Sequence, residues 1–127
     1  MTKEETLQNL RQAWNSTVHS VYASRHPRYV LNFSFSIIDN KKFEWLIIDE
    51  KGTPWYEMTI NLDIDDPLYE IQHKLRNLGC CFKLTASALK KKYPQMYTNE
   101  INDSIIEECL WFCKNFYFAI SNVRGDY

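Results

Sequence analysis

The chain has 127 residues, with 15 basic against 16 acidic side chains, and only 3 glycines beside 4 Trp, 8 Tyr and 7 Phe. Because Gly52, Gly79 and Gly125 lie far apart, no glycine-rich loop can surround a phosphate group, which argues against nucleotide-dependent enzymes. The net charge of −1 argues against a protein that binds polyanions over its whole surface.

The first predicted element is an amphipathic helix that ends before Pro27. Thr2 and Glu5 have the spacing of a capping box, and apolar residues recur at helical intervals from Leu7 to Val21. The N-terminus has no continuous apolar leader, and the chain has no apolar run long enough to span a membrane. We therefore expect a soluble cytoplasmic protein that does not associate with a membrane.

Residues 29–62 change to a period of two and predict three strands. Short loops between them favour an antiparallel meander. The middle strand, 43–48, has apolar residues on both faces. Leu46 and Ile48 lie on its second face and would form an apolar patch with Trp55. Either a helix or a second copy of the chain must cover this patch. A homodimer is therefore one of two alternatives.

The remaining residues predict three helices. Asp66 and Pro67 begin one that continues to Gly79. A linker at 80–84 follows, in which residues 81–84 could add a short strand to the sheet, and it precedes a helix over 85–93. The last helix, from about residue 100 to 121, is apolar almost all round, so we expect it in the core or shared with another chain. The fold class is α+β: an N-terminal helix, a three-stranded antiparallel β-meander, and three helices packed on the sheet, in a single domain over 1–127.

The near-neutral net charge of the chain is the sum of two strongly and oppositely charged segments and two weakly charged ones. Residues 43–70 hold one base and eight acids, a net of −7, whereas residues 71–99 hold six bases and no acid, a net of +6. On the third strand, alternation places Trp55 on the outward side with Glu57. Aromatic residues among charges are typical of protein interfaces. The predicted partner-binding residues are Glu44, Asp49, Glu50, Trp55, Glu57, Asp63 and Asp65.

The leading hypothesis is a small non-enzymatic inhibitor, of the immunity-protein or antitoxin type. Its acidic surface would block a basic protein partner such as a nuclease-like toxin. A competing interpretation is that the acidic and basic segments pack beside each other and neutralise their charges. A lower-ranked alternative is a nucleic-acid-associated accessory protein, for which the predicted contacts are Lys83, Lys90, Lys91 and Lys92. These lysines are also typical of a solvated helix face.

A third hypothesis is a small hydrolase that pairs His26 or His73 with a cysteine. The four cysteines are Cys80, Cys81, Cys109 and Cys113. Their spacing does not match a structural zinc site, so we interpret them as packing residues. The acids before Pro67 lack the spacing of a calcium loop and suit helix capping instead. We expect no metal, no cofactor and no catalytic residues.

Overall fold

The computed structural model describes residues 2–24 and 31–125. These residues form four helices and three strands, in the order α1 (Lys3–Ser24), β1 (Asn32–Ile38), β2 (Lys42–Ile48), β3 (Pro54–Asn61), α2 (Pro67–Arg76), α3 (Leu78–Lys92) and α4 (Asn99–Arg124). The predicted α+β layout, with one helix before a three-stranded antiparallel sheet and three after it, is confirmed. None of the described helices combines the length and apolarity needed to cross a bilayer.

The segment after α2 differs from the prediction. Residues 80–84 are neither a linker nor a short strand, because α3 already begins at Leu78, directly after Asn77. Gly79 therefore lies in the first turn of a helix, where it costs at most about 1 kcal/mol relative to alanine. Phe82 is 0% exposed and packs edge-on against Tyr56 of β3, with ring centroids 6.1 Å apart. Burial of one such ring outweighs the glycine penalty.

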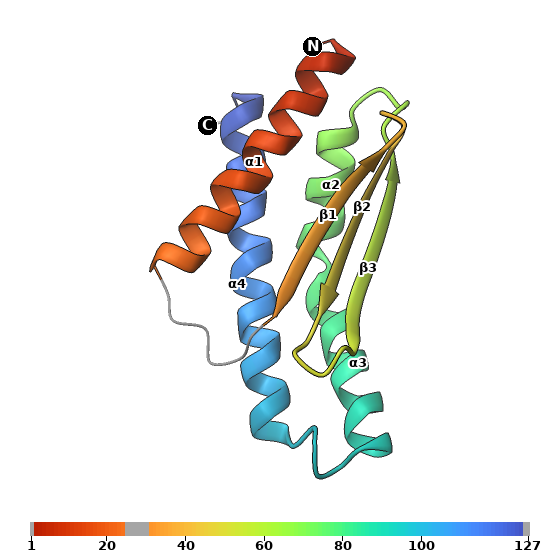
Figure 1. Ribbon diagram of the computed structural model, residues 1–127, viewed down its shortest axis with the longest axis vertical. Coiled ribbons are helices and arrows are strands. Elements are labelled where there is room, and N and C mark those ends of the chain that lie inside the picture. Colours follow the sequence, from red (N-terminus) through yellow and green to blue (C-terminus); the bar gives the residue numbers. More distant parts are fainter. Residues whose placement is uncertain (1, 25–30, 126–127) are drawn as a thin grey trace.

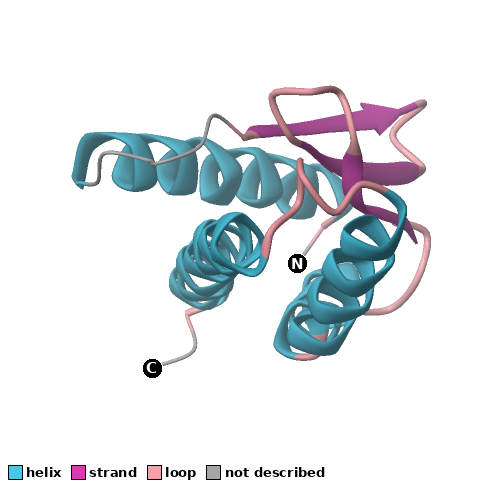
Figure 2. Ribbon diagram, turned by 90° about the horizontal axis from the view of Figure 1, so that it is seen from below, coloured by secondary structure: helices cyan, strands magenta, loops and turns pink. Residues whose placement is uncertain are grey.

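The sheet has the order β1-β2-β3, and the helices lie on one of its faces (Figures 1 and 2). Residues 39–41 join β1 to β2. Asp39 and Asn40 have φ of 53° and 57°, the left-handed geometry of a type I′ turn, and Lys41 N closes this turn by donating to Ile38 O at 2.9 Å. The pairing brings Phe35 opposite Trp45, and Trp45 opposite Met58. These three side chains point toward the helices, so the helical layer seals this face of the sheet.

Aromatic rings of α1, β2 and α4 form the centre of the core. Trp14 lies 5.1 Å from Phe112 and 5.3 Å from Phe116, measured between ring centroids. Trp45 lies 6.0 Å from Phe112. α4 is thus the core helix, as predicted, but it is not buried all round, since Phe118 is 54% exposed.

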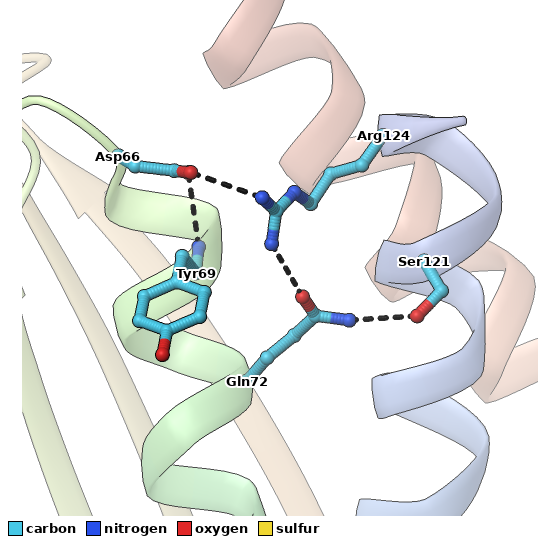
Figure 3. Close-up of polar contacts among 5 residues, drawn as sticks. All are labelled: Asp66, Tyr69, Gln72, Ser121 and Arg124. Atoms are coloured by element: carbon cyan, nitrogen blue, oxygen red, sulfur yellow. Dashed lines mark hydrogen bonds and ion pairs between the residues drawn. The ribbon is translucent and has the colours of Figure 1, made fainter. Parts of the chain in front are cut away.

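Polar contacts fasten the start of α2 to the end of α4 (Figure 3). Asp66 caps α2 by accepting a hydrogen bond from the backbone N–H of Tyr69 at 3.1 Å, and it pairs with Arg124 at 3.0 Å. Arg124 also donates to Gln72 at 2.7 Å, and the Gln72 amide donates to Ser121 at 2.8 Å. The cap that starts one helix therefore also positions the last turn of the other.

Candidate functional site

The outer face of the sheet is covered by no described helix (Figure 2). Alternation places serines and glutamates on this face in cross-strand rows, together with Lys42, Leu46 and Ile48. In one row, Ser34 lies opposite Leu46, which lies opposite Glu57. In the next row, Ser36 lies opposite Glu44. Facing side chains of antiparallel strands are about 5 Å apart, and diagonal ones about 7 Å. The two glutamates are therefore diagonal neighbours on one small surface.

A hollow of about 240 Å³ lies on this face. It is lined by Ser34, Phe35, Ser36, Glu44, Trp45, Leu46 and Glu57. The hollow forms where two serines, with short side chains, stand beside a leucine and two longer glutamates. Carboxylates are hydrogen-bond acceptors only, and hydroxyls can accept as well as donate. This lining suits a cationic donor, such as a guanidinium or ammonium group.

Both carboxylates on this face are available to a ligand. Glu57 is exposed and Glu44 is half-buried. Within the described part of the chain, neither forms a hydrogen bond or an ion pair. Two like charges on one sheet face repel each other, and a bound cation between them relieves that repulsion. We call Ser34, Ser36, Glu44, Leu46 and Glu57 the acidic sheet face.

Trp55 and Asp49 do not lie on this face, so the predicted exposed aromatic among the acids was wrong. Trp55 is 2% exposed and Asp49 is 6% exposed. The register of β2 against β3 shifts after Ile47, and Trp55 is the extra residue of this bulge. Trp55 therefore does not point to the same side of β3 as Glu57. Its ring instead packs against the Tyr97 ring, with centroids 6.3 Å apart.

A buried hydrogen-bond network surrounds the Asp49 carboxylate. Its Oδ1 accepts from the backbone N–H groups of Lys51 at 2.9 Å and Thr53 at 3.0 Å. Its Oδ2 accepts from Trp55 Nε1 at 3.0 Å and from the Tyr97 hydroxyl at 2.6 Å. Burial alone would raise the pKa of Asp49, but these four hydrogen bonds together lower it below its ordinary 3.8. The network fastens the β2–β3 hairpin to the segment before α4.

The same network acts on Tyr97. Burial, followed by the hydrogen bond to Asp49, raises the pKa of the Tyr97 phenol above its ordinary value. The phenol therefore stays protonated at neutral pH and keeps donating to the carboxylate. Tyr97 and Asp49 consequently have a structural role, and neither group is presented to a partner, since Tyr97 is 1% exposed.

The remaining predicted acids lie at opposite ends of β3. Glu50 is exposed in the β2–β3 loop, whereas Asp63 and Asp65 are exposed in the connection to α2. Asp63 forms an ion pair with Lys3 of α1. Eight residues of strand span about 25 Å, so one ligand side chain cannot contact both groups. Of the predicted acids, the fold brings only Glu44 and Glu57 together on the outer sheet face.

The predicted nucleic-acid contacts all lie exposed on α3. Lys83 and Lys90 share one helix face, because they are seven residues apart. Lys90 donates to the Asn99 side chain at 2.8 Å, and Lys92 lies 5.4 Å from the centre of the Tyr93 ring. Lys91 points about 100° from each of its neighbours. The four lysines therefore do not form one row of equivalent phosphate contacts.

The residues of the hydrolase hypothesis fall into three situations. His26 lies outside the described residues. His73 is exposed and its ring stacks on Tyr69, with ring centroids 6.3 Å apart. The described residues hold no cluster of His, Cys, Asp or Glu that could bind a metal. Burial, with the charge of Glu108 adding to it, raises the pKa of the Cys109 thiol to about 12. Burial likewise raises the pKa of Cys113. Buried thiols of this kind are poor nucleophiles at neutral pH. Cys80 and Cys81 are exposed, so the interpretation of these two as packing residues was wrong.

Sequence reasoning missed the Asp49 network, although one local signal pointed toward it. Asp at the first position of a turn and Gly at the fourth are typical of a type I turn. Asp49 and Gly52 have this spacing, Gly52 N donates to Asp49 O at 3.0 Å, and Gly52 has φ of 85°. The contact with Tyr97 had no local signal, because it joins residues 48 positions apart.

Comparison with known proteins finds no match to this chain among protein-family models, curated proteins or solved structures. The proposals for its function therefore depend on the arrangement of its own side chains.

Proposed function

We propose that this protein is a non-enzymatic inhibitor that binds a basic protein partner, such as a nuclease-like toxin, through the acidic sheet face. The observation that supports this most directly is the pair of carboxylates, Glu44 and Glu57, beside a hollow on a sheet face that no described helix covers. Neither carboxylate has a hydrogen bond or an ion pair with another described residue. Of the binding residues predicted from the sequence, the proposal keeps Glu44 and Glu57. It leaves out Asp49, Glu50, Trp55, Asp63 and Asp65, which do not lie on the acidic sheet face.

The size of the hollow favours a partner side chain over a small metabolite. At about 240 Å³ it is smaller than the roughly 300–1,000 Å³ common for ligand pockets. An arginine of the partner would insert its apolar stem beside Leu46 and direct its guanidinium to the two carboxylates. Charge complementarity of this kind raises the rate of association and rejects acidic competitors.

The test compares two variants with the same change of charge. Glu44→Gln/Glu57→Gln neutralises the acidic sheet face, whereas Glu4→Gln/Asp103→Asn neutralises two exposed acids on α1 and α4. Each immobilised protein is incubated with cell lysate at low salt, and captured proteins are identified by mass spectrometry. We expect the first variant to lose basic proteins that the wild type and the second variant retain. Equal capture by all three would rule out the acidic sheet face.

A second candidate function is nucleic-acid binding through α3, favoured by the exposure of Lys83, Lys90, Lys91 and Lys92 beside the 41% exposed Tyr93. Exposed lysines release counterions on binding phosphates, and an exposed aromatic ring can stack on a base. We expect this mode to weaken steeply with salt. A mixed oligonucleotide pool titrated at two salt concentrations tests it, and absence of binding at the lower concentration would exclude it.

A further inference from the structure

A second surface lies in the helical layer, between α2 and α4, which pack side by side (Figure 1). It is a groove of about 380 Å³, lined by Leu75, Arg76, Leu110, Cys113, Lys114, Tyr117 and Phe118. The sequence pattern of α4 predicted burial for most of these positions. The structure instead leaves Leu110 at 40% and Phe118 at 54% exposure. Two large apolar side chains therefore border an apolar groove that is open to a ligand.

Three exposed residues of α4 line the groove and form one stripe. Leu110, Lys114 and Phe118 follow each other at intervals of four, so they stand above one another on the same helix face. Single exposed apolar residues are normal on protein surfaces, but apolar residues gathered around a groove mark sites of interaction. Buried Leu75 and Cys113 complete the apolar lining.

The charge of the groove is positive. Arg76 and Lys114 are its charged lining residues, and the lining contains no carboxylate. Arg76 lies 5.1 Å from the centre of the Tyr117 ring and donates a hydrogen bond to the Tyr117 hydroxyl. These two contacts hold the guanidinium at the edge of the groove. A guanidinium has five N–H donors, so further donors remain for a ligand.

We propose that this groove binds an acidic, amphipathic helical segment of a partner protein. Apolar anchors at helical spacing would fill the groove between Leu110 and Phe118, in the way that amphipathic helices enter apolar grooves. Carboxylates of the segment would pair with Arg76 and Lys114. A second copy of this chain in a two-fold contact is disfavoured, because it would bring the same cations of both copies together. This surface is distinct from the acidic sheet face and would bind a ligand of the opposite charge.

The experiment uses a fluorescein-labelled peptide with leucines at every third or fourth position and glutamate or glutamine elsewhere. A matched peptide carries lysine in place of each glutamate. Fluorescence anisotropy measures binding of both to the full chain. We expect the acidic peptide to bind and the basic peptide to bind at least about tenfold more weakly, a difference of roughly 1.4 kcal/mol.

Three variants locate the binding. Phe118→Gln and Lys114→Glu change exposed groove residues, so both should fold, which circular dichroism checks. Each should weaken the acidic peptide about tenfold, since central anchors carry most of the energy of an interface. Leu84→Gln is the control, because Leu84 is 72% exposed on α3 and does not line the groove. It should leave affinity unchanged.

Three results would overturn the proposal. The first is no binding of the acidic peptide, or equal binding of both peptides. The second is equal affinity of wild type and Phe118→Gln. The third is a concentration-dependent dimer, seen by light scattering, that Phe118→Gln abolishes, because a second copy would then be the occupant. The sheet-face variant Glu44→Gln/Glu57→Gln should bind the acidic peptide normally, which separates this test from that of the proposed function.

Discussion

Substitution of Asp49 by asparagine tests whether the buried network stabilises the fold. Asparagine has nearly the same shape, but it replaces one acceptor oxygen by an NH₂ group. If the amide oxygen keeps the two backbone bonds from Lys51 and Thr53, the NH₂ group faces Trp55 Nε1 and the Tyr97 hydroxyl. The hydroxyl can turn and accept, but the indole N–H can only donate. At least one donor therefore loses its partner in either amide orientation: the indole N–H in this one, and the two backbone N–H groups in the other.

The expected loss of stability follows from these contacts. A hydrogen bond to a charged group contributes about 1.5–3 kcal/mol, and an unsatisfied buried donor costs about 1–3 kcal/mol. Solvent does not replace the lost bond, since Trp55 is 2% and Tyr97 is 1% exposed. We expect Asp49→Asn to lower the free energy of unfolding by about 3 kcal/mol, a large part of the roughly 5–15 kcal/mol typical of a domain.

Urea unfolding followed by tryptophan fluorescence measures this change, and its pH dependence identifies the carboxylate as the cause. The pKa of Asp49 is lower in the folded protein than its ordinary 3.8, so its ionised form stabilises the fold above that pH. This stabilisation disappears as the pH falls through the lowered folded pKa. The difference between wild type and Asp49→Asn should therefore be complete at neutral pH and shrink progressively in acid.

Two controls test whether the loss of stability comes from the Asp49 network. Tyr97→Phe removes one bond to the carboxylate, and in a double-mutant cycle it should couple to Asp49→Asn by at least about 0.5 kcal/mol. Asp103→Asn makes the same chemical change at an exposed position and should leave stability within about 0.5 kcal/mol. A loss below about 1 kcal/mol in Asp49→Asn, or a loss of the same size at all pH values, would refute the structural role of the network.

Three further predictions concern other parts of the fold. Gly52→Ala should cost about 1 kcal/mol in urea unfolding, because φ is 85° while no atom lies within 4 Å of the added Cβ. Asp66→Ala should cost about 1 kcal/mol by the same measurement, mainly through the lost cap of α2, since its ion pair with Arg124 is half exposed. A thiol reagent should label the exposed Cys80 and Cys81 in the folded protein, whereas Cys109 and Cys113 should react only after unfolding.

Elements with a clear period were predictable from the sequence, and long-range contacts were not. The alternation in β1 and β2 and the Asp66 cap of α2 are local signals, and the structure confirms them. The helix over residues 80–84 was missed because Gly79 resembles a helix end, while burial of Phe82 favours continuation. The groove beside Phe118 was missed because the apolar residues of α4 do not show how much of this helix the neighbouring elements cover.

The net charge of residues 43–70 overstated how many acidic side chains are free to bind a partner, and the fold explains why. Asp49 is enclosed in the hairpin network, and Asp63 and Asp66 form ion pairs with Lys3 and Arg124. These acids contribute to stability, which leaves fewer of them to attract a partner.

The bulge at Trp55 links the buried network to the acidic sheet face. An outward indole two residues before Glu57 would stand beside that carboxylate and add apolar bulk to the face. Because of the bulge, the indole N–H instead donates a hydrogen bond to Asp49. The outer face therefore keeps its small serines and its hollow. The interactions that bury Trp55 therefore also preserve the shape of the surface proposed to bind a basic partner.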